Sequence, residues 1–345
     1  MEYPEVDIVV LNYNGKKFLG DCFHSLKDST YPKKHVFLLD NASPNDDVAY
    51  VRANYPWVKI IQNPLNNGYC AAYNLAFEQC SSKYIICLNN DVVVDKHWLE
   101  PMVALAESNP KIGAIQPKIL AMKSPEYFEY AGASGGQIDK YGFPFMRGRI
   151  FDSLEKDLGQ YNDAAQIFWA SGAAMLVNKE ALKYSGNLDE IIVHHMDEID
   201  LCWRLQLSGF EVRVEPKSFI YHVGGATIAA RSFKKTYWNH RNSIYMMLKN
   251  YGFANMVGRT FVHILLDYIA LAQSLLTGQF QVARGIFMAH IWLIGHIGLI
   301  VKERKKVQGN RKASDTIIDR NMYQGSIVWA YFGKKIKTYT QLTNN

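Results

Sequence analysis

The stretch Tyr84-Ile-Ile-Cys-Leu-Asn-Asn-Asp91 is a hydrophobic run that ends abruptly in two amides and a carboxylate, before Val92-Val-Val94 resumes. Ile85, Ile86 and Leu88 are typical of a strand that is buried on both faces. The carboxyl ends of such strands are where open α/β sheets bind their ligands. The stretch therefore predicts a buried strand followed either by an ordinary polar turn or by a ligand site that includes Asp91.

Three earlier stretches repeat this pattern of an apolar run that stops at polar residues. Residues 6–11 stop at Asn12-Tyr-Asn-Gly15, residues 36–39 stop at Asp40, and residues 58–61 stop at a loop rich in Pro, Asn and Gly. Between the first two, residues 16–26 carry apolar side chains at helical spacing. Strands that alternate with helices predict an α/β fold with a mostly parallel sheet flanked by helices.

The length and composition are those of a well-cored globular protein. The chain has 345 residues, of which 48% are hydrophobic, and it can form one large or two ordinary domains. Residues 132–163 are rich in Gly, Tyr and charge without a sustained period, which indicates an irregular excursion or a β-hairpin. We expect one main domain over residues 1–250 and a C-terminal, apolar helical extension over residues 251–345.

The C-terminal region contains two strongly apolar runs, residues 260–269 and 286–300. Each is shorter than the about 20 residues that a spanning helix needs. Asp267, His290 and His296 within them also disfavour spans. We expect a helical hairpin that packs on the main domain, forms an oligomer interface, or lies in a membrane interface, where it would make a peripheral membrane contact. Ordinary core helices and full spans are the alternatives.

A run of basic residues follows these helices and adds to a formal net charge of +6. Such a run suits the anionic headgroups of a membrane or the phosphates of a nucleic acid. Because the cations stand beside an apolar hairpin and not among exposed aromatic residues, we expect lipid and no nucleic acid. The run comprises Lys302, Arg304, Lys305, Lys306, Arg311 and Lys312, followed by Lys334, Lys335 and Lys337.

The five cysteines are odd in number and have no paired metal spacing. They look like small buried hydrophobes of a reducing compartment. The first residues lack the basic segment and apolar run of a secretory signal. We therefore expect the protein to work in the cytoplasm, at the inner face of the cell membrane.

Polar side chains follow each of the predicted strands, at Asn12, Asp40, residues 66–68 and residues 89–91. In a parallel sheet these ends converge on one crevice, so separate loops can supply contacts to the base, ribose and diphosphate of a single nucleotide. The chain has neither a Gly-x-Gly-x-x-Gly turn after the first strand nor a Walker lysine motif, which argues against a dehydrogenase or a P-loop NTPase. Ordinary turns rich in Asn and Asp are the alternative at each position.

Taken in order, these motifs resemble those of family 2 glycosyltransferases of the GT-A (nucleotide-diphospho-sugar transferase) fold, of the rhamnosyltransferase-like kind. The resemblance runs from about Val6 to Gly225. The motifs that carry it are Val9-Val-Leu-Asn-Tyr-Asn-Gly15, Leu38-Leu-Asp-Asn-Ala-Ser43, Asn66-Asn-Gly-Tyr-Cys-Ala-Ala-Tyr-Asn74, Leu88-Asn-Asn-Asp91, Trp169-Ala-Ser-Gly172, His195-Met-Asp-Glu-Ile-Asp-Leu-Cys-Trp-Arg204 and Tyr221-His-Val-Gly-Gly225.

This resemblance implies an inverting transfer of a sugar, of the hexosyl or rhamnosyl class, by the main domain. The donor would be a UDP- or dTDP-sugar, and the acceptor a hydroxyl of a glycan or lipid-linked molecule in bacterial cell-surface polysaccharide synthesis. It also implies an acceptor side that includes Trp169 and Gly172. The donor-binding residues that it implies are Leu11, Asn12, Tyr13, Asp40, Asn66, Gly68, Asn74, Asn90 and Asp91.

A leaving diphosphate must be neutralised as it departs, and a divalent cation held by oxygen ligands can do this. Asp91 is the carboxylate we expect to hold Mn²⁺ or Mg²⁺. The resemblance implies that His222 approaches the same ion, and a histidine ligand suits Mn²⁺ better than Mg²⁺. Because Asn89 and Asn90 stand where many relatives have acids, we expect weak metal binding. Adjacent His194 and His195 do not form a zinc site, because neighbouring side chains diverge.

On the other side of the sugar, the acceptor hydroxyl must lose its proton to a carboxylate. In the family the second member of an acidic pair is the base, which is Glu198 here, with Asp197 before it. The usual order of Glu and Asp is reversed, so either carboxylate remains a candidate. Asp200 has Arg204 four residues on and predicts a structural ion pair. Trp169 and Tyr130 could stack on the acceptor or simply pack.

Two other functions remain open at this point. A nucleotidyltransferase shares a nucleotide-binding sheet and a metal, but it needs a Gly-rich signature with Lys or Arg, which Asn12-Tyr-Asn-Gly15 does not supply. A non-catalytic, glycan-binding scaffold of the same fold would not need the acidic residues Asp91 and Glu198.

Overall fold

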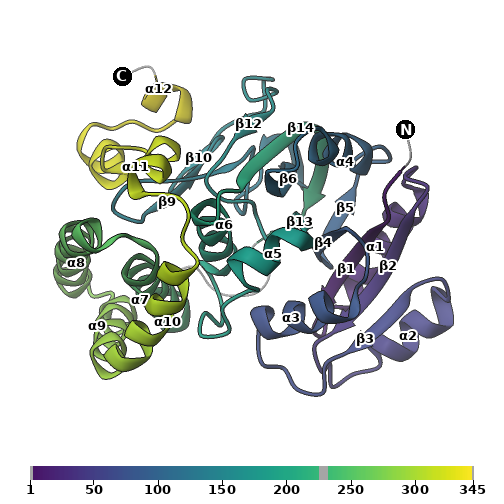
Figure 1. Ribbon diagram of the computed structural model, residues 1–345, viewed down its shortest axis with the longest axis horizontal. Coiled ribbons are helices and arrows are strands. Elements are labelled where there is room, and N and C mark those ends of the chain that lie inside the picture. Colours follow the sequence, from purple (N-terminus) through teal and green to yellow (C-terminus); the bar gives the residue numbers. More distant parts are fainter. Residues whose placement is uncertain (1–2, 225–231, 344–345) are drawn as a thin grey trace.

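The computed structural model describes residues 3–224 and 232–343, and its centre is a ten-stranded sheet (Figure 1). The N-terminal part of this sheet is parallel, in the order β4-β1-β2-β3. Asn12 pairs with Asp40, and Leu11 pairs with Asn89, so the polar ends of β1, β2 and β4 lie at one edge. The four strands are β1 (Val6–Asn12), β2 (Lys34–Asp40), β3 (Lys59–Gln62) and β4 (Tyr84–Asn89).

Helices cover both faces of this parallel part, as the strand pattern predicts. Val9 and Cys87 pack in the same core as helix α3, whereas Val10 and Leu88 pack in the core that contains α1 and α4. Neighbouring residues of one strand point to opposite faces, which explains the continuous apolar runs. The helices are α1 (Lys16–Asp28), α2 (Asp47–Asn54), α3 (Tyr69–Gln79) and α4 (Leu99–Ser108).

The second part of the sheet is mixed, so the sheet as a whole is less parallel than the repeated pattern predicts. Strand β13 is antiparallel to both β4 and β6, whereas β14 is parallel to β6. A long excursion precedes β13 in place of a single crossover helix, so the chain can enter the sheet in the opposite direction. The strands are β5 (Val92–Val94), β6 (Ile112–Ala121), β7 (Ser124–Phe128), β12 (Ala165–Gln166), β13 (Ala174–Asn178) and β14 (Glu211–His222).

The predicted excursion over residues 132–163 forms a small antiparallel sheet in the order β11-β10-β9-β8. Its strands are β8 (Gly136–Ile138), β9 (Pro144–Met146), β10 (Arg149–Ile150) and β11 (Ser153–Leu154). Helix α5 (Lys179–Ser185) follows β13, and helix α6 (Asp197–Leu207) comes next and precedes β14. The prediction of a hairpin excursion is thus confirmed, and α6 matches the helix predicted around Asp197.

Four longer helices form a group at the opposite side of the molecule from β1–β3 (Figure 1). They are α7 (Phe233–Asn250), α8 (Phe253–Leu276), α9 (Phe280–Gly295) and α10 (Ile297–Gly309). Helices α8 and α9 form the predicted hairpin, and the predicted division at residue 250 falls between α7 and α8. The chain ends with α11 (Asp315–Ile318), a 3₁₀ turn (Asp319–Asn321), a π-helical turn (Trp329–Gly333) and α12 (Tyr339–Thr343).

Among the described residues, no single helix has the length and apolar character to cross a membrane. Helices α9 and α10 meet those requirements only as a pair, and they are bent by 74° relative to each other.

The five cysteines are buried and free, as predicted. The predicted basic run is only partly available to a ligand. Arg304 donates to the carbonyl oxygens of Leu248 and Tyr251, and Arg311 pairs with Asp315. These two guanidinium groups hold the chain together, whereas Lys302 and Lys305 of α10 are exposed.

Candidate active site

The structure brings together the two predicted metal ligands, Asp91 and His222. Strand β14 pairs with β5, which places His222 opposite Val92, the residue after Asp91. His222 Nε2 lies 3.1 Å from Asp91 Oδ1, and His222 Nδ1 lies 3.0 Å from Glu129 Oε2. The imidazole ring is therefore held between two carboxylates.

These contacts fix the charge of His222. Burial lowers the pKa of the imidazole, but the hydrogen bonds and charges of Asp91 and Glu129 outweigh it and raise the pKa to about 10. Two neighbouring ligands of one octahedral ion lie roughly 3 Å apart, because each stands about 2.1 Å from the metal. Asp91 and His222 have this spacing.

Asp91 and His222 therefore fit a divalent cation, and Glu129 fits the role of the group that orients a metal-binding histidine. Within residues 3–224 and 232–343, no group of three or more His, Cys, Asp or Glu side chains has the arrangement of a metal site. The described residues thus offer two ligands, so the diphosphate and water would supply the others.

Asp40, at the end of β2, has an unused hydrogen-bond acceptor. Its Oδ2 accepts a hydrogen bond of 3.3 Å from the N–H group of Ser43. Its Oδ1 is buried and has no partner. An unpaired buried carboxylate oxygen is costly and calls for an explanation. A ring N–H of a nucleobase would satisfy it.

The predicted donor residue Asn12 is instead part of the framework of the site. It is wholly buried, donates to Asp47 Oδ2 at 2.8 Å and accepts from Asn90 Nδ2 at 2.7 Å. Asp47 Oδ2 also accepts from the N–H group of Gly15. A Cβ atom at Gly15 would lie 1.9 Å from Asn90 Nδ2, so a glycine is required there. Asn12 and Asn90 thus join the ends of β1 and β4.

Two further expectations need correction. Asn74 of α3 does not face a free crevice, because its amide bonds both the N–H and the carbonyl groups of Leu188 and also Glu190. Trp169 is only 3% exposed, and its Nε1 donates to the Gln137 carbonyl, so its ring cannot stack on an acceptor. Both side chains have structural roles. Tyr130 is 42% exposed, and the Arg149 guanidinium lies over its ring at 3.1 Å from the ring centroid.

The other predicted donor residues lie around the same edge of the sheet. Leu11 is half-buried, and Tyr13 is exposed after β1. Asn66 Oδ1 accepts from Asn41 Nδ2 and from the Gly68 N–H group, which shapes the loop before α3. Gly225, the last residue of the final motif, lies outside the described residues.

The second group of carboxylates stands at the start of α6. Burial raises the pKa of Asp197 well above its ordinary value, and the charge of Glu198 adds to this effect. Burial also raises the pKa of Glu198, although its own N–H group and Asp197 donate hydrogen bonds that lower it in part. The two groups titrate as a pair, in which Asp197 holds a proton more readily.

Tyr69 and Gly172 connect this pair to the strand ends. The Tyr69 hydroxyl donates to the Gly172 carbonyl at 3.2 Å. Burial raises the pKa of this phenol, and the nearby charges of Asp197 and Glu198 raise it further. The Asn89 N–H group donates to the carbonyl of Ala173, the residue after Gly172. The acceptor-side loop therefore lies beside both the Asp91 strand end and the carboxylate pair.

Comparison with known proteins decides the family. The model of "Glycosyl transferase family 2" matches residues 7–183, which is half of the chain. The chain belongs to this family. This match confirms the resemblance, and the protein is a glycosyltransferase. The match disfavours the two alternative functions, a nucleotidyltransferase and a non-catalytic scaffold.

The relatives and solved structures agree with this result. The glycosyltransferase is 23% identical over 287 residues to the poly-β-1,6-N-acetyl-D-glucosamine synthase of Staphylococcus epidermidis, covering 77% of this chain and 64% of that protein. It thus spans just under two thirds of that relative's length. A mannosyltransferase of Pyrobaculum calidifontis, solved with GDP-Man and Mn²⁺, has a TM-score of 0.54 at 13% identity, covering 97% and 89% of the two chains.

GalNAc-T7, solved with UDP, GalNAc and Mn²⁺, has a TM-score of 0.57 at 15% identity and covers 72% of this chain and 48% of its own. Both solved structures confirm the GT-A fold. The match to the family ends before α6 and His222, so the placement of those groups rests on the geometry described above.

Two residues of the glycosyltransferase site escape detection in the sequence. Glu129 follows β7, a strand not predicted from the sequence, and Asp47 begins the short helix α2. Their burial, at 4% and 0% exposure, is what distinguishes them. A charged residue this buried is rare unless it is paired. Nothing in the spacing of the sequence signals it.

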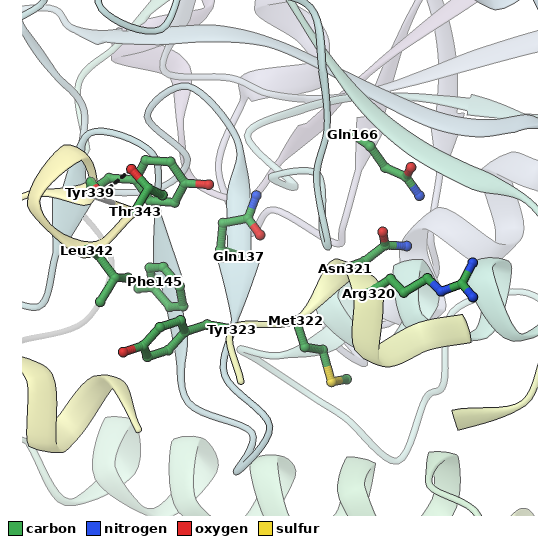
Figure 2. A pocket seen from close by; sticks show the side chains of 10 residues that line it. All are labelled: Gln137, Phe145, Gln166, Arg320, Asn321, Met322, Tyr323, Tyr339, Leu342 and Thr343. Atoms are coloured by element: carbon green, nitrogen blue, oxygen red, sulfur yellow. Dashed lines mark hydrogen bonds between the residues drawn. The ribbon is translucent and has the colours of Figure 1, made fainter. Parts of the chain in front are cut away.

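A separate hollow of about 420 Å³ lies between β8, β9 and the C-terminal segment (Figure 2). Aromatic and amide side chains line it, including Phe145, Tyr323, Tyr339 and Gln137. Its lining contains no carboxylate and no histidine, and none of the predicted site residues. It therefore differs in chemistry from the site of Asp91 and Glu198.

Proposed function

We propose that the protein transfers a sugar, with inversion, from a UDP- or dTDP-sugar to a hydroxyl of a glycan or lipid-linked acceptor in cell-surface polysaccharide synthesis. One observation carries the proposal. The Asp91–His222 pair lies at the strand ends, and the loop of Gly172 and Ala173 bonds both Asn89 near that pair and Tyr69, which lies near buried Asp197 and half-buried Glu198. A nucleotide-sugar donor needs ligands for its metal ion, which Asp91 and His222 can supply. An acceptor hydroxyl needs a base, which the Asp197–Glu198 pair can supply.

On the donor side, Asp40 accepts the ring N–H of a pyrimidine base through its unpaired oxygen. Asp91 and His222 would hold the divalent cation, Mn²⁺ or Mg²⁺, and Glu129 accepts the Nδ1–H of His222, which leaves Nε2 as the nitrogen that would meet the ion. When bound, the cation would supply the positive charge that offsets the leaving diphosphate. Asn12 and Asn90 keep the strand ends that carry these groups in register.

On the acceptor side, Glu198 removes the proton of the attacking hydroxyl. A raised pKa makes a carboxylate a stronger base near neutral pH, and burial supplies that rise. No second nucleophile is needed for a single displacement, so the configuration at the sugar carbon inverts. Asp197 donates a hydrogen bond to Glu198 and keeps its proton.

A donor screen tests this function. The purified protein is incubated with UDP-, dTDP- and GDP-sugars, with and without Mn²⁺, and release of the nucleoside diphosphate is measured. We expect turnover with a uridine or thymidine donor that requires the ion, and turnover lower by about 10²–10⁴-fold in Glu198→Gln. Turnover confined to a GDP-sugar would contradict the assigned base contact, and equal turnover in Glu198→Gln would contradict the assigned base.

We also propose that the protein makes a peripheral contact with the inner face of the cell membrane. Helix α8 has an inverted pattern, since its buried residues are Thr260, His263, Asp267 and Ser274. Asp267 bonds His240 of α7 and His290 of α9, so its buried carboxylate is paired on both sides. Large apolar side chains are exposed on α8–α10: Phe253, Val257, Phe261, Leu265, Tyr268, Ile269, Leu276, Phe280, Phe287, Ile291, Ile294, Ile297 and Val301.

An apolar surface of this extent marks an interaction site, and the exposed Lys302 and Lys305 at its edge favour an anionic lipid surface. Sedimentation with vesicles of phosphatidylcholine, with and without phosphatidylglycerol, tests the contact. We expect binding that needs the anionic lipid and falls in Phe261→Glu but not in Leu158→Glu, a control on an exposed loop. Failure to bind vesicles, together with a dimer that Phe261→Glu dissociates, would make the face an oligomer interface.

A further inference from the structure

The backbone just before α6 adopts an unusual conformation. His195 has a φ of 62° and Met196 a φ of 66°, so two consecutive residues with side chains lie in the left-handed region. Such a conformation is strained for a residue with a side chain and persists only where the surroundings hold it. Asp197 and Glu198 follow directly. The start of the helix that carries the proposed base is therefore a strained turn.

Asn242 of α7 holds this turn. Its Nδ2 donates to the carbonyl oxygen of His194 at 2.7 Å and to that of His195 at 3.0 Å. An amide NH₂ group has two donors, and here both are used on two successive carbonyls. Asn242 is wholly buried, so water cannot replace these bonds. Its Oδ1 accepts from Arg241 Nε, which fixes the amide orientation.

Helix α7 is in turn fixed to α6 and to the segment before the turn. Lys249 Nζ lies 2.9 Å from Asp200 Oδ2, and Asn250 Nδ2 donates to Asp200 Oδ1 at 2.9 Å. Asp200 also pairs with Arg204 at 2.8 Å, which confirms the predicted ion pair. Arg241 donates to the Ile191 carbonyl. These contacts hold Asn242 at a set position relative to the first turn of α6.

We propose that Asn242 is a positioning residue for the Asp197–Glu198 pair: it holds the left-handed His195–Met196 turn and thereby sets the direction of the Glu198 carboxylate. This inference rests on the proposed role of Glu198 as the base. Without the two bonds to Asn242, His195 and Met196 relax towards ordinary backbone conformations. The first turn of α6 then rotates, and Glu198 no longer faces the acceptor hydroxyl.

Kinetics of Asn242→Ala test the proposal. We expect kcat to fall at least about tenfold, because a small displacement of a catalytic group is costly. KM for the donor and the affinity for the nucleoside diphosphate should stay unchanged. Ile244→Ala is the control, since it shortens an equally buried side chain of the same helix that belongs to the apolar cluster of Leu293 and Ile300 and makes no hydrogen bond to the turn or to α6. We expect it to lower Tm without this loss of kcat.

A second substitution separates positioning from packing. Glycine adopts a positive φ without steric cost, so Met196→Gly should restore several-fold the kcat lost in Asn242→Ala. If Asn242→Ala does not fold, Asn242→Asp keeps the side-chain shape while removing the donor, and it should lose kcat in the same way. Wild-type kcat in a folded Asn242 variant, or no restoration by Met196→Gly, would overturn the inference.

Glu198→Gln, measured beside these variants, distinguishes the two possible failures. If Glu198→Gln is inactive while Asn242→Ala keeps full kcat, only the role of Asn242 is wrong. If Glu198→Gln itself keeps full turnover, the proposed base is wrong.

Discussion

The two carboxylate groups of the site are supported in different ways. Asp40 and Asp91 stand at the ends of β2 and β4, where strand register and the Asn12–Asn90 bond bring them to one edge. Asp197 and Glu198 stand on a helix that begins with a strained turn, and Asn242 of helix α7 holds that turn. The positions of the donor-side groups are therefore set by the sheet, whereas the position of the acceptor-side pair is set by helix α7.

The largest effect that separates the two sides is expected for Glu198→Gln. General base catalysis contributes about 10²–10⁴-fold to a rate, so kcat should fall by that order. Donor affinity, measured by calorimetry with UDP, should stay at the wild-type value because the donor side is intact. A parallel loss of UDP binding would show that the two sides are not independent.

The pH dependence gives the next effect. Burial raises the pKa of Glu198, and the base works only when it is ionised. Activity should therefore fall as the pH drops through that raised pKa, about tenfold per pH unit below it, beginning above the ordinary glutamate value of about 4.3. The measurement is kcat/KM for the acceptor against pH at saturating donor. Full activity at pH values near 4 would contradict a buried base.

A smaller effect, confined to the donor side, is expected for Asp40→Asn. The asparagine side chain has one acceptor oxygen in place of a charged carboxylate. Loss of a hydrogen bond to a charged acceptor costs about 1.5–3 kcal/mol, so KM for the donor should rise roughly 10- to 100-fold. The pH profile should keep its shape. Asp46→Asn is the control, because Asp46 is exposed and pairs only with Lys16. Equal KM values in the two variants would refute the role of Asp40.

The same contrast explains what the sequence reveals. Strand ends show themselves as apolar runs that stop at polar residues, so Asp40 and Asp91 could be found along with the strands. The motif around Asp197 located α6. Burial is harder to foresee, because Trp169 and Asn74 match family motifs and yet bind inside the protein.

Long-range partners leave no local signal at all. Glu129 meets His222 across 93 positions of the chain, and Asn242 meets His194 across 48. The reversed direction of β13 and the internal bonds of Arg304 also depend on tertiary packing. The sequence could therefore predict the strand ends and α6, but not the distant residues that hold them.

The most direct test of the account measures how Mn²⁺ changes the affinity for UDP in the wild type, Asp91→Ala and Glu198→Gln. We expect Mn²⁺ to tighten UDP binding in the wild type and in Glu198→Gln but not in Asp91→Ala. Of the two substituted residues, Asp91 is the proposed metal ligand and Glu198 is not. An equal effect of Mn²⁺ in folded Asp91→Ala would contradict the account.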